Sequence, residues 1–280
     1  MAEYTPPPNR VRVIESPANP LIKVLRGALA EGVTRQGLLA VEGPFLVEEA
    51  LNAKEHTVVH SVLLAQSERG KFSGLLARLP KEAEVACVPD RIFRQLAETQ
   101  SPQGIAALVE LRQEKLESAL GRRDTLLLVA CGLQDPGNLG TMMRSAQAFG
   151  GSALITLEGT VSPFNPKAVR ASAGAVFHLP VFERLKTEPL FRQLRKAGVR
   201  IIAADRRSPT SLTDADLRGS LAILVGQEAA GLSPDLLHEA NLLLSIPIRE
   251  SMNSMNAAVA ASIFLFEAAR QREFRYRVIG

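Results

Sequence analysis

The chain has 280 residues, 46% of them hydrophobic, and this content is enough for the core of one large domain or two ordinary ones. No stretch reaches the roughly 18 consecutive apolar residues of a membrane span, and the proline-rich start lacks the apolar core of a signal peptide. Cys87 and Cys131 stand far apart in sequence and match no metal-ligand spacing. We therefore expect a cytoplasmic protein with two buried, reduced thiols, without a bound metal and without a membrane partner.

The formal net charge of +4 is a modest basic excess, which permits a nucleic-acid partner without requiring one. Arginine is concentrated at the end of the chain, at Arg270, Arg272, Arg275 and Arg277. These side chains fit two interpretations equally well. One is a solvated helix end, where cations are favourable, and the other is a contact with RNA.

The first 112 residues alternate strand-like and helix-like segments, which predicts a small α/β or α+β domain. The first dozen residues, with prolines at 6–8, have the composition of a flexible tail. Hydrophobic periodicity predicts helices at 21–29, from Pro44 onward, around 75–76 and from Pro89 to Leu96. Apolar runs predict strands at 38–41, 58–65, 85–88 and 104–111.

Residues 113–123 are polar and charged, and we interpret them as a linker with some helical character. The region 124–280 has a stronger apolar pattern and predicts a second domain. Its short continuous apolar runs are typical of strands buried on both faces of a parallel sheet. These runs lie at Leu126–Ala130, Ala153–Leu157, 201–204, Leu221–Val225 and 242–246. Helical patterns follow at 139–149 and 190–197, and a long helix carrying Met255, Val259 and Phe266 on one face is predicted at the end.

Three loops of the second domain follow strands and combine glycine or proline with polar residues, as ligand-binding loops of α/β sheets do. In the first loop, Pro136 and Gly137 predict a tight turn. Asn138 and Gly140 bracket a predicted helix start, whose free N–H groups attract anions such as phosphate. Arg144 lies one turn further, where its guanidinium could hold a phosphate with two hydrogen bonds. Alone, this loop fits an ordinary capped helix with a surface arginine better.

The second and third loops carry weaker signals when each is taken alone. Gly226 and Gly231 allow a close approach of backbone to a ligand, and Glu228 between them could orient a polar group or be a solvated turn residue. In the third loop, Pro247 removes a backbone donor directly after a strand. Ser254 is the predicted N-cap of the last helix and Asn256 is predicted in its first turn, and capping is compatible with a catalytic role.

Together, three segments resemble the SpoU family of RNA ribose 2′-O-methyltransferases, within the SPOUT superfamily. They are Asn-Leu-Gly-x-x-x-Arg at 138–144, Gly-x-Glu-x-x-Gly at 226–231 and Ile-Pro followed by Ser-x-Asn at 246–256, in the family's order and approximate spacing. The match covers about 126–272 and includes the family-like stretch 164–175. The segments 19–23, 41–43 and 101–104 resemble the family's substrate-binding domain, which is similar to certain RNA-binding ribosomal proteins.

The resemblance has three small departures, which concern details of cofactor packing. Ala229 stands where many members have glycine, Met255 replaces a leucine, and alanines at 257–258 replace a bulkier pair.

The resemblance implies an α/β fold with a C-terminal parallel-sheet SPOUT domain that contains a trefoil knot, preceded by a smaller RNA-binding domain. It implies S-adenosylmethionine as cofactor and a homodimer through the C-terminal domain, with active sites that take residues from both chains. The cofactor-binding residues carried over by position are Leu224, Gly226, Gln227, Gly231, Ile246, Ile248 and Met255. The catalytic residues carried over are Asn138, Arg144, Glu228, Ser254 and Asn256.

The family's catalytic arginine corresponds to Arg144, and a guanidinium stays protonated at neutral pH. We therefore interpret Arg144 as a clamp on an RNA phosphate. Asn138 and Asn256 would orient the ribose and the loop, and Glu228 would fix the third loop or Arg144 by charge-assisted hydrogen bonds. The proton of the ribose hydroxyl could pass to the phosphate, to Ser254 or to a strongly perturbed Arg144, and the sequence does not choose.

The predicted reaction is methyl transfer from S-adenosylmethionine to a ribose 2′-hydroxyl, with 23S ribosomal RNA favoured as substrate by the N-terminal domain. An antibiotic-resistance methyltransferase, a transfer-RNA methyltransferase and a non-catalytic RNA-binding protein on the same fold are the alternatives. A nucleotide-cofactor oxidoreductase is disfavoured because the glycine fingerprint is missing. We expect the N-terminal domain to supply the RNA affinity. Its basic residues either bind phosphates or form a solvated face, and they are Arg10, Arg12, Lys23, Arg26 and Arg35.

Overall fold

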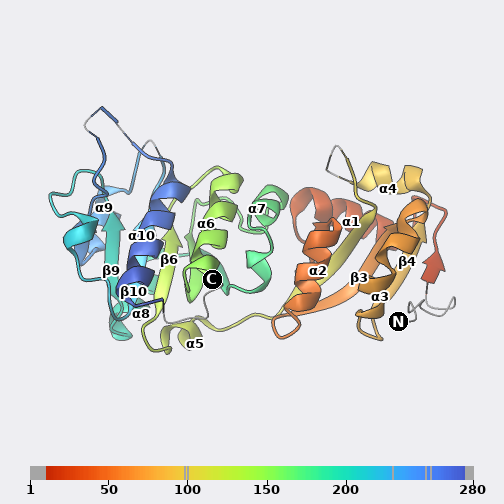
Figure 1. The fold of residues 1–280 in the computed structure, drawn as a ribbon, viewed down its shortest axis with the longest axis horizontal. Helices are drawn as coiled ribbons and strands as arrows, with labels where there is room; N and C mark the ends of the chain where they lie inside the picture. The colour runs from red at the N-terminus through yellow and green to blue at the C-terminus, as the bar shows by residue number, and fades with distance from the viewer. Residues whose placement is uncertain are drawn as a thin grey trace. The chain divides into compact units, whose positions relative to one another are not determined.

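The computed structural model describes residues 11–97, 99, 101–228, 230–249, 251–252 and 254–274, in two compact units (Figure 1). The N-terminal unit comprises Met1–Gln113 together with Phe164–Arg170, and the C-terminal unit comprises Glu114–Pro163 and Ala171–Gly280. Of the segment interpreted as a linker, Gln113 groups with the N-terminal unit, and residues 114–123, which contain the short helix α5 (Leu116–Leu120), group with the C-terminal unit. The prolines at 6–8, Arg10, Ala229, Arg275 and Arg277 lie outside the described residues.

The N-terminal unit is built on a five-stranded mixed sheet in the order β1-β4-β3-β5-β2. The strands are β1 (Val11–Val13), β2 (Leu39–Glu42), β3 (Thr57–Ala65), β4 (Glu84–Val88) and β5 (Ile105–Leu111). The helices are α1 (Pro20–Glu31), α2 (Pro44–Asn52), α3 (Ser73–Ala77) and α4 (Asp90–Leu96), with the 3₁₀ helix η2 (Gln66–Phe72) before α3. Strand β4 runs parallel to β1 and β3, whereas β5 runs antiparallel to both of its neighbours.

The strand β1 was not predicted, because its first two residues, 11 and 12, were assigned to a flexible tail. The structure pairs Val11–Val13 in parallel with residues 85–87 of β4, and the backbone N–H of Ile14 donates to Cys87 O at 2.9 Å. The burial of Ile14 beside α1 and α4 explains why this short segment is ordered, since it adds an apolar side chain to the core.

The C-terminal unit contains a six-stranded, all-parallel sheet in the order β11-β9-β10-β6-β7-β8, which confirms the predicted parallel sheet. Its strands are β6 (Leu126–Ala130), β7 (Ala153–Leu157), β8 (Val181–Leu185), β9 (Arg200–Ala204), β10 (Leu221–Val225) and β11 (Leu242–Leu244). Its helices are α6 (Pro136–Ala148), α8 (Thr187–Lys196), α9 (Pro234–Glu239) and α10 (Ala257–Gln271). The remaining elements are α7 (Pro166–Ala171), most of which groups with the N-terminal unit, and the 3₁₀ helices η3 (Ala175–Phe177) and η4 (Leu212–Asp214).

Strands β6, β7 and β10 are buried on both faces, which is why their sequences are continuous apolar runs. Strand β8 was missed because it is an edge strand without a single fully buried side chain. The strand predicted at 242–246 ends earlier, at Leu244, and residues 245–248 lead into the third loop.

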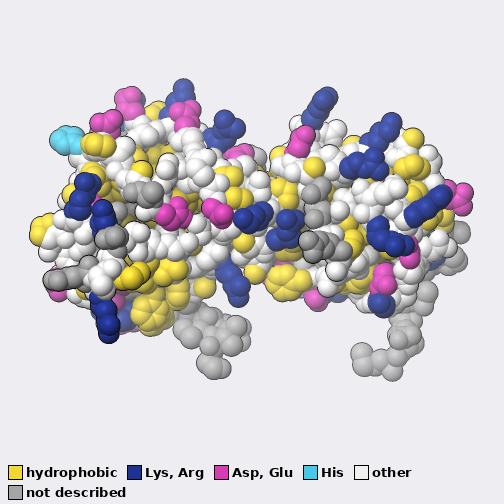
Figure 2. All heavy atoms as spheres, turned by 90° about the horizontal axis from the view of Figure 1, so that it is seen from above, with side chains coloured by type: hydrophobic (Ala, Val, Ile, Leu, Met, Phe, Trp, Pro, Cys, Tyr) yellow, Lys and Arg dark blue, Asp and Glu magenta, His cyan; other side chains and the backbone are white. Residues whose placement is uncertain are grey.

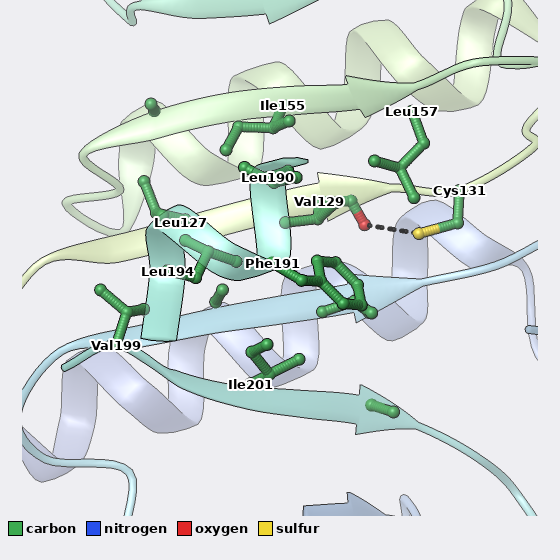
Figure 3. Packing of buried hydrophobic residues seen from close by; sticks show 14 of the residues in the cluster. Leu127, Val129, Cys131, Ile155, Leu157, Leu190, Phe191, Leu194, Val199 and Ile201 are labelled. Carbon is green, nitrogen blue, oxygen red and sulfur yellow. Dashed lines mark hydrogen bonds between the residues drawn. The ribbon is translucent and has the colours of Figure 1, made fainter. Parts of the chain in front are cut away.

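Helices cover both faces of this sheet. Figure 3 shows Leu190, Phe191 and Leu194 of α8 packed over Val129 and Ile155 of the strands on one face. On the other face α6 and α10 lie side by side (Figure 1), and the hydroxyl oxygens of Ser145 and Ser262 are 2.7 Å apart across their contact. The helices therefore hold the ends of β6 and β10 in a fixed relation, which matters for the loops that follow these strands.

The starts of two helices differ from the prediction. Pro136 and Gly137 are not a turn before α6 but its first residues, and Asp135 is the N-cap, accepting from the N–H of Asn138 at 2.9 Å. Proline is favoured at this position because its missing N–H is unpaired there in any case. Helix α10 is capped by Asn256, whose Oδ1 accepts from the N–H groups of Ala258 and Val259, and Ser254 precedes the helix. The prediction of Ser254 as N-cap was therefore wrong.

Both cysteines are buried and free, as predicted. Burial raises the pKa of the Cys131 thiol to about 12, and burial likewise raises the pKa of Cys87, so both remain protonated thiols at neutral pH. Within the described part of the chain, no group of three or more side chains is arranged to hold a metal ion. None of the helices described is both long and apolar enough to cross a membrane.

Candidate active site

A cavity of about 290 Å³ lies at the carboxyl end of the parallel sheet of the C-terminal unit. It is bounded by the ends of β9, β10 and β11 and by the first turns of α10. Carboxyl ends of parallel strands are where α/β proteins bind ligands, because strand ends deliver loops to one edge of the sheet. The cavity is near the lower end of the range of about 300–1,000 Å³ typical of small-molecule sites.

Most residues predicted to bind a cofactor line this cavity. They are Gly226, Gln227, Gly231, Ile246, Ile248 and Met255, joined by Glu228 and Ser254 from the predicted catalytic set. Leu224 does not line it, because its side chain is fully buried in the core cluster beneath α8. Strand alternation explains this exception, since Leu224 and Val225 point to opposite faces and Val225 reaches the cavity.

The second loop closes on itself through its backbone. Gln227 and Gly231 exchange backbone hydrogen bonds of 3.2 and 2.9 Å, and Gly231 has a φ of +68°, which favours glycine. A Cβ on Gly226 would come within 2.2 Å of Gly231 O. Gly226 is therefore required for the loop itself, so a valine there would distort the loop rather than merely block a ligand.

Side chains from all three loops form one hydrogen-bond chain. Glu228 Oε1 accepts from Asn138 Nδ2, and Asn138 Oδ1 accepts from Asn256 Nδ2 at 2.9 Å. The three residues are 90 and 118 positions apart in sequence, yet each has a partner in the next loop. Asn256 also caps α10, so the chain of bonds is anchored on a helix end. We refer to Glu228, Asn138 and Asn256 as the polar relay.

Arg144 is exposed on α6, two turns beyond Asn138, and does not line the cavity. No hydrogen bond or ion pair joins it to another described residue, and Glu228 bonds to Asn138 rather than to Arg144. The guanidinium is therefore free to bind an external anion. Ser254 is exposed at the cavity, and its hydroxyl has no partner within the part of the chain that the structure describes.

Sequence reasoning missed the contribution of β9. Its last residue and the following turn, residues 204–207, line the cavity with Asp205, Arg206 and Arg207, and Asp205 Oδ1 lies 3.4 Å from Arg207 Nε. The available signal was position, since this charged turn follows an apolar run in the same way as the three recognised loops. The inner wall is apolar, with Leu244 and with Ala260 and Phe264 of α10.

The parallel sheet with a polar cavity at its carboxyl edge defines a ligand-binding α/β protein, and comparison with known proteins specifies the class. Residues 125–266 match the SpoU rRNA Methylase family, and residues 29–115 match the RNA 2′-O ribose methyltransferase substrate-binding domain. The chain belongs to the SpoU family of RNA ribose 2′-O-methyltransferases.

Individual relatives cover most of the chain. It is 34% identical to the 23S rRNA (guanosine(2553)-2′-O)-methyltransferase of Bacillus subtilis over 83% of this chain and 89% of that protein. It is 31% identical to a 23S rRNA (uridine(2479)-2′-O)-methyltransferase of Streptomyces viridochromogenes over 85% of each. The crystal structure of an AdoMet-bound rRNA methyltransferase from Sinorhizobium meliloti superimposes with a TM-score of 0.80 at 29% identity, covering 93% of this chain and 98% of that one.

The protein is thus an S-adenosylmethionine-dependent RNA ribose 2′-O-methyltransferase with an N-terminal substrate-binding domain. The cavity fits this cofactor chemically. Its apolar wall of Leu244, Ile246 and Phe264 suits an adenine ring, while Asp205 and Glu228 provide acceptors for the cofactor's hydroxyl and ammonium groups.

Proposed function

We propose that this protein methylates a ribose 2′-hydroxyl of 23S ribosomal RNA. The curated relatives named above act on 23S rRNA, and they differ in the nucleotide that they modify. The N-terminal match to a substrate-binding domain supports a structured RNA as substrate. The target nucleotide must therefore be set by contacts that vary between these relatives.

The observation that carries the proposed mechanism is that the polar relay and an unpaired arginine share the helix α6. S-adenosylmethionine, when bound, supplies the methyl group. Glu228 lies at the cavity and bonds to Asn138 on α6, the helix that also bears Arg144. The relay therefore fixes the first turn of α6 relative to the cofactor cavity, and with it the position from which Arg144 extends. A positioned reaction of this type gains much of its rate from geometry alone.

Arg144 acts as a phosphate clamp in this proposal. Its guanidinium is exposed and lacks a partner among the described residues. Because a guanidinium donates hydrogen bonds and accepts none, Arg144 suits an RNA phosphate better than a role as base. A cation beside the ribose stabilises the alkoxide that forms as the hydroxyl loses its proton. Ser254 lies at the cavity, and its hydroxyl can take that proton only while passing its own proton on. The RNA phosphate is an acceptor that can take the proton directly or from Ser254.

We further propose a homodimer through the face formed by α6 and α10. Val259 and Phe266 on α10 are 47% and 46% exposed, and Phe149 stacks edge-on against Phe266 at 5.7 Å. Figure 2 shows hydrophobic side chains gathered over α10 on this face. Light scattering should give a dimer at micromolar concentration, and Val259→Glu should give a monomer. A monomeric unaltered protein would refute this interface.

The proposed substrate is tested by methylating total RNA from a strain that lacks the gene and mapping 2′-O-methyl groups. We expect one modified position in 23S rRNA. Methylation confined to transfer RNA would refute the ribosomal substrate, and S-adenosylmethionine binding without methylation of any RNA would favour the non-catalytic alternative.

A further inference from the structure

A second cavity, of about 490 Å³, lies at the opposite edge of the same parallel sheet. It is bounded by the residues that precede β6 and β10 and by the last turn of α10. The five residues of β10 separate this edge from Gly226 at the cofactor cavity, a length of about 17 Å at the rise of a strand. The second cavity is therefore distinct from the active site.

Arginine dominates the lining of this cavity. Four arginines from three separate segments reach it, with one acidic residue, Asp124, among the other lining residues. The arginines are Arg122, Arg123, Arg218 and Arg272. Such convergence concentrates positive charge at one place, although the net charge of the whole chain is only +4.

Arg272 is held in place by the backbone. Its guanidinium donates to the carbonyl oxygens of Leu217 at 3.2 Å, Asp124 at 2.7 Å and Gly219. Burial is the main cause that lowers the pKa of Arg272, and the attraction of Asp124 opposes it. The hydrogen bonds that the side chain of this half-buried cation donates to described residues all go to carbonyl dipoles, so a bound anion would stabilise it. These bonds to the backbone show that Arg272 is not a solvated helix end, and its contact with RNA stays a prediction.

The other arginines keep donors available. Arg122 binds Glu114 and the carbonyl of Ser152, and Arg218 uses Nε and Nη2 for Asp216, which leaves Nη1 of Arg218 unengaged by that pair. The Arg123 side chain is 92% exposed, and its Nε lies 3.7 Å from Asp124 Oδ2. A guanidinium that uses some of its N–H groups for hydrogen bonds within the protein can still donate its remaining N–H groups to a phosphate.

We propose that this arginine cavity is a second contact for the phosphate backbone of the RNA substrate, remote from the methylated ribose. The volume exceeds what one small anion fills. RNA is the polyanion on which this enzyme acts, and arginine forks match phosphate geometry. The inference requires that the substrate is RNA, which family membership supports. It does not depend on which nucleotide is methylated.

The test compares Arg123→Gln with Arg218→Gln, singly and together, in the full chain. A fluorescent 23S rRNA fragment and a 20-nucleotide single-stranded RNA serve as probes, with affinity measured at several salt concentrations. Each lost phosphate contact should reduce the slope of log affinity against log salt by roughly 0.7–0.9. S-adenosylmethionine affinity and thermal unfolding should stay unchanged.

Arg192→Gln provides the matched control. Arg192 is an exposed arginine on α8 of the same unit, and its Nη2 lies 2.7 Å from Glu188 Oε1. It should not alter the salt slope. Unchanged affinity and slope in the Arg123 and Arg218 double variant would overturn the proposal. Normal RNA binding with lost binding of inorganic phosphate would also overturn it and would indicate a small-anion site. A change in the oligomeric state alone, measured by light scattering, would overturn it as well and would indicate contact with a second copy. Loss of 23S rRNA methylation alone, with RNA binding intact, would bear on the proposed function and not on this cavity.

Discussion

The two units treat their polar side chains differently. In the C-terminal unit, Glu228, Asn138 and Asn256 are joined by hydrogen bonds, and Glu228 lines the cavity at the carboxyl edge of the sheet. In the N-terminal unit, Lys23, Arg26 and Arg35 are exposed, and their side chains form no hydrogen bond or ion pair with the described residues. We propose that the difference reflects two tasks. Methyl transfer needs groups held in one geometry, whereas binding an RNA backbone needs charges that can adapt to it.

The largest expected effect on methyl transfer comes from Arg144, the cation that we place in the reaction. Arg144→Ala should lower methyl transfer by about 10²–10³-fold, the usual cost of removing one group that stabilises developing charge. Arg144→Lys should restore little, because an ammonium lacks the fork of a guanidinium. Cofactor affinity by calorimetry should not change, since Arg144 lies outside the cavity. Near-normal turnover of the lysine variant would show that a bidentate contact between residue 144 and the phosphate is not needed.

Filling the cofactor cavity should separate binding from positioning. Ala260→Leu places a larger side chain in the cavity wall on α10. Overpacking costs about 1–3 kcal/mol, so the affinity for S-adenosylmethionine should fall by about tenfold or more. Ala197→Leu, at the exposed end of α8, is the control and should bind normally. An Ala260→Leu protein that binds the cofactor within twofold of the unaltered protein would place the cofactor elsewhere.

The polar relay is tested by a variant that keeps the helix cap. In Asn256→Asp, a carboxylate oxygen still accepts from the N–H groups of Ala258 and Val259, but the donor to Asn138 is lost. We expect unchanged thermal stability and a loss of about tenfold in kcat/KM, the equivalent of one hydrogen bond of about 1.4 kcal/mol. Asn256→Ala should lose activity and stability together. Full activity of Asn256→Asp would mean that the relay is only structural.

The N-terminal unit should show small effects that add up. Replacing Lys23, Arg26 and Arg35 together by glutamine should reduce the salt slope of RNA binding by about 2–3, at roughly 0.7–0.9 per contact. Arg78→Gln is the control, because Arg78 is engaged by Glu48 and Asn52. Point variants are preferable to deleting residues before about 120, because Phe164–Arg170 belongs to the N-terminal unit and would lose its packing partners. The packing is close, since a Cβ on Gly32 would lie 1.8 Å from Phe164 O. An unaltered slope would refute the assignment of RNA affinity to these cations.

The sequence by itself determined the elements and the chemistry of the loops. The strands β6, β7 and β10 could be predicted because burial on both faces requires uninterrupted apolar residues, and this requirement is local. The residues of the relay could be named because their types and spacing form an ordered set that resembles a family. Edge strands such as β1 and β8 could not be predicted, because their stability comes from a partner strand and leaves little pattern of its own.

Tertiary structure alone decided which of those residues meet. The bonds from Asn138 to Glu228 and to Asn256 span 90 and 118 positions, and no local rule predicts such pairs. It also decided that Asn256, rather than Ser254, caps α10, and that Leu224 faces the core. The arginine cavity has the same origin, since Arg123, Arg218 and Arg272 come together only when the sheet forms. The physical reason is common to all of these: side-chain partners and strand faces depend on how distant elements pack, whereas apolar periodicity is written along the chain.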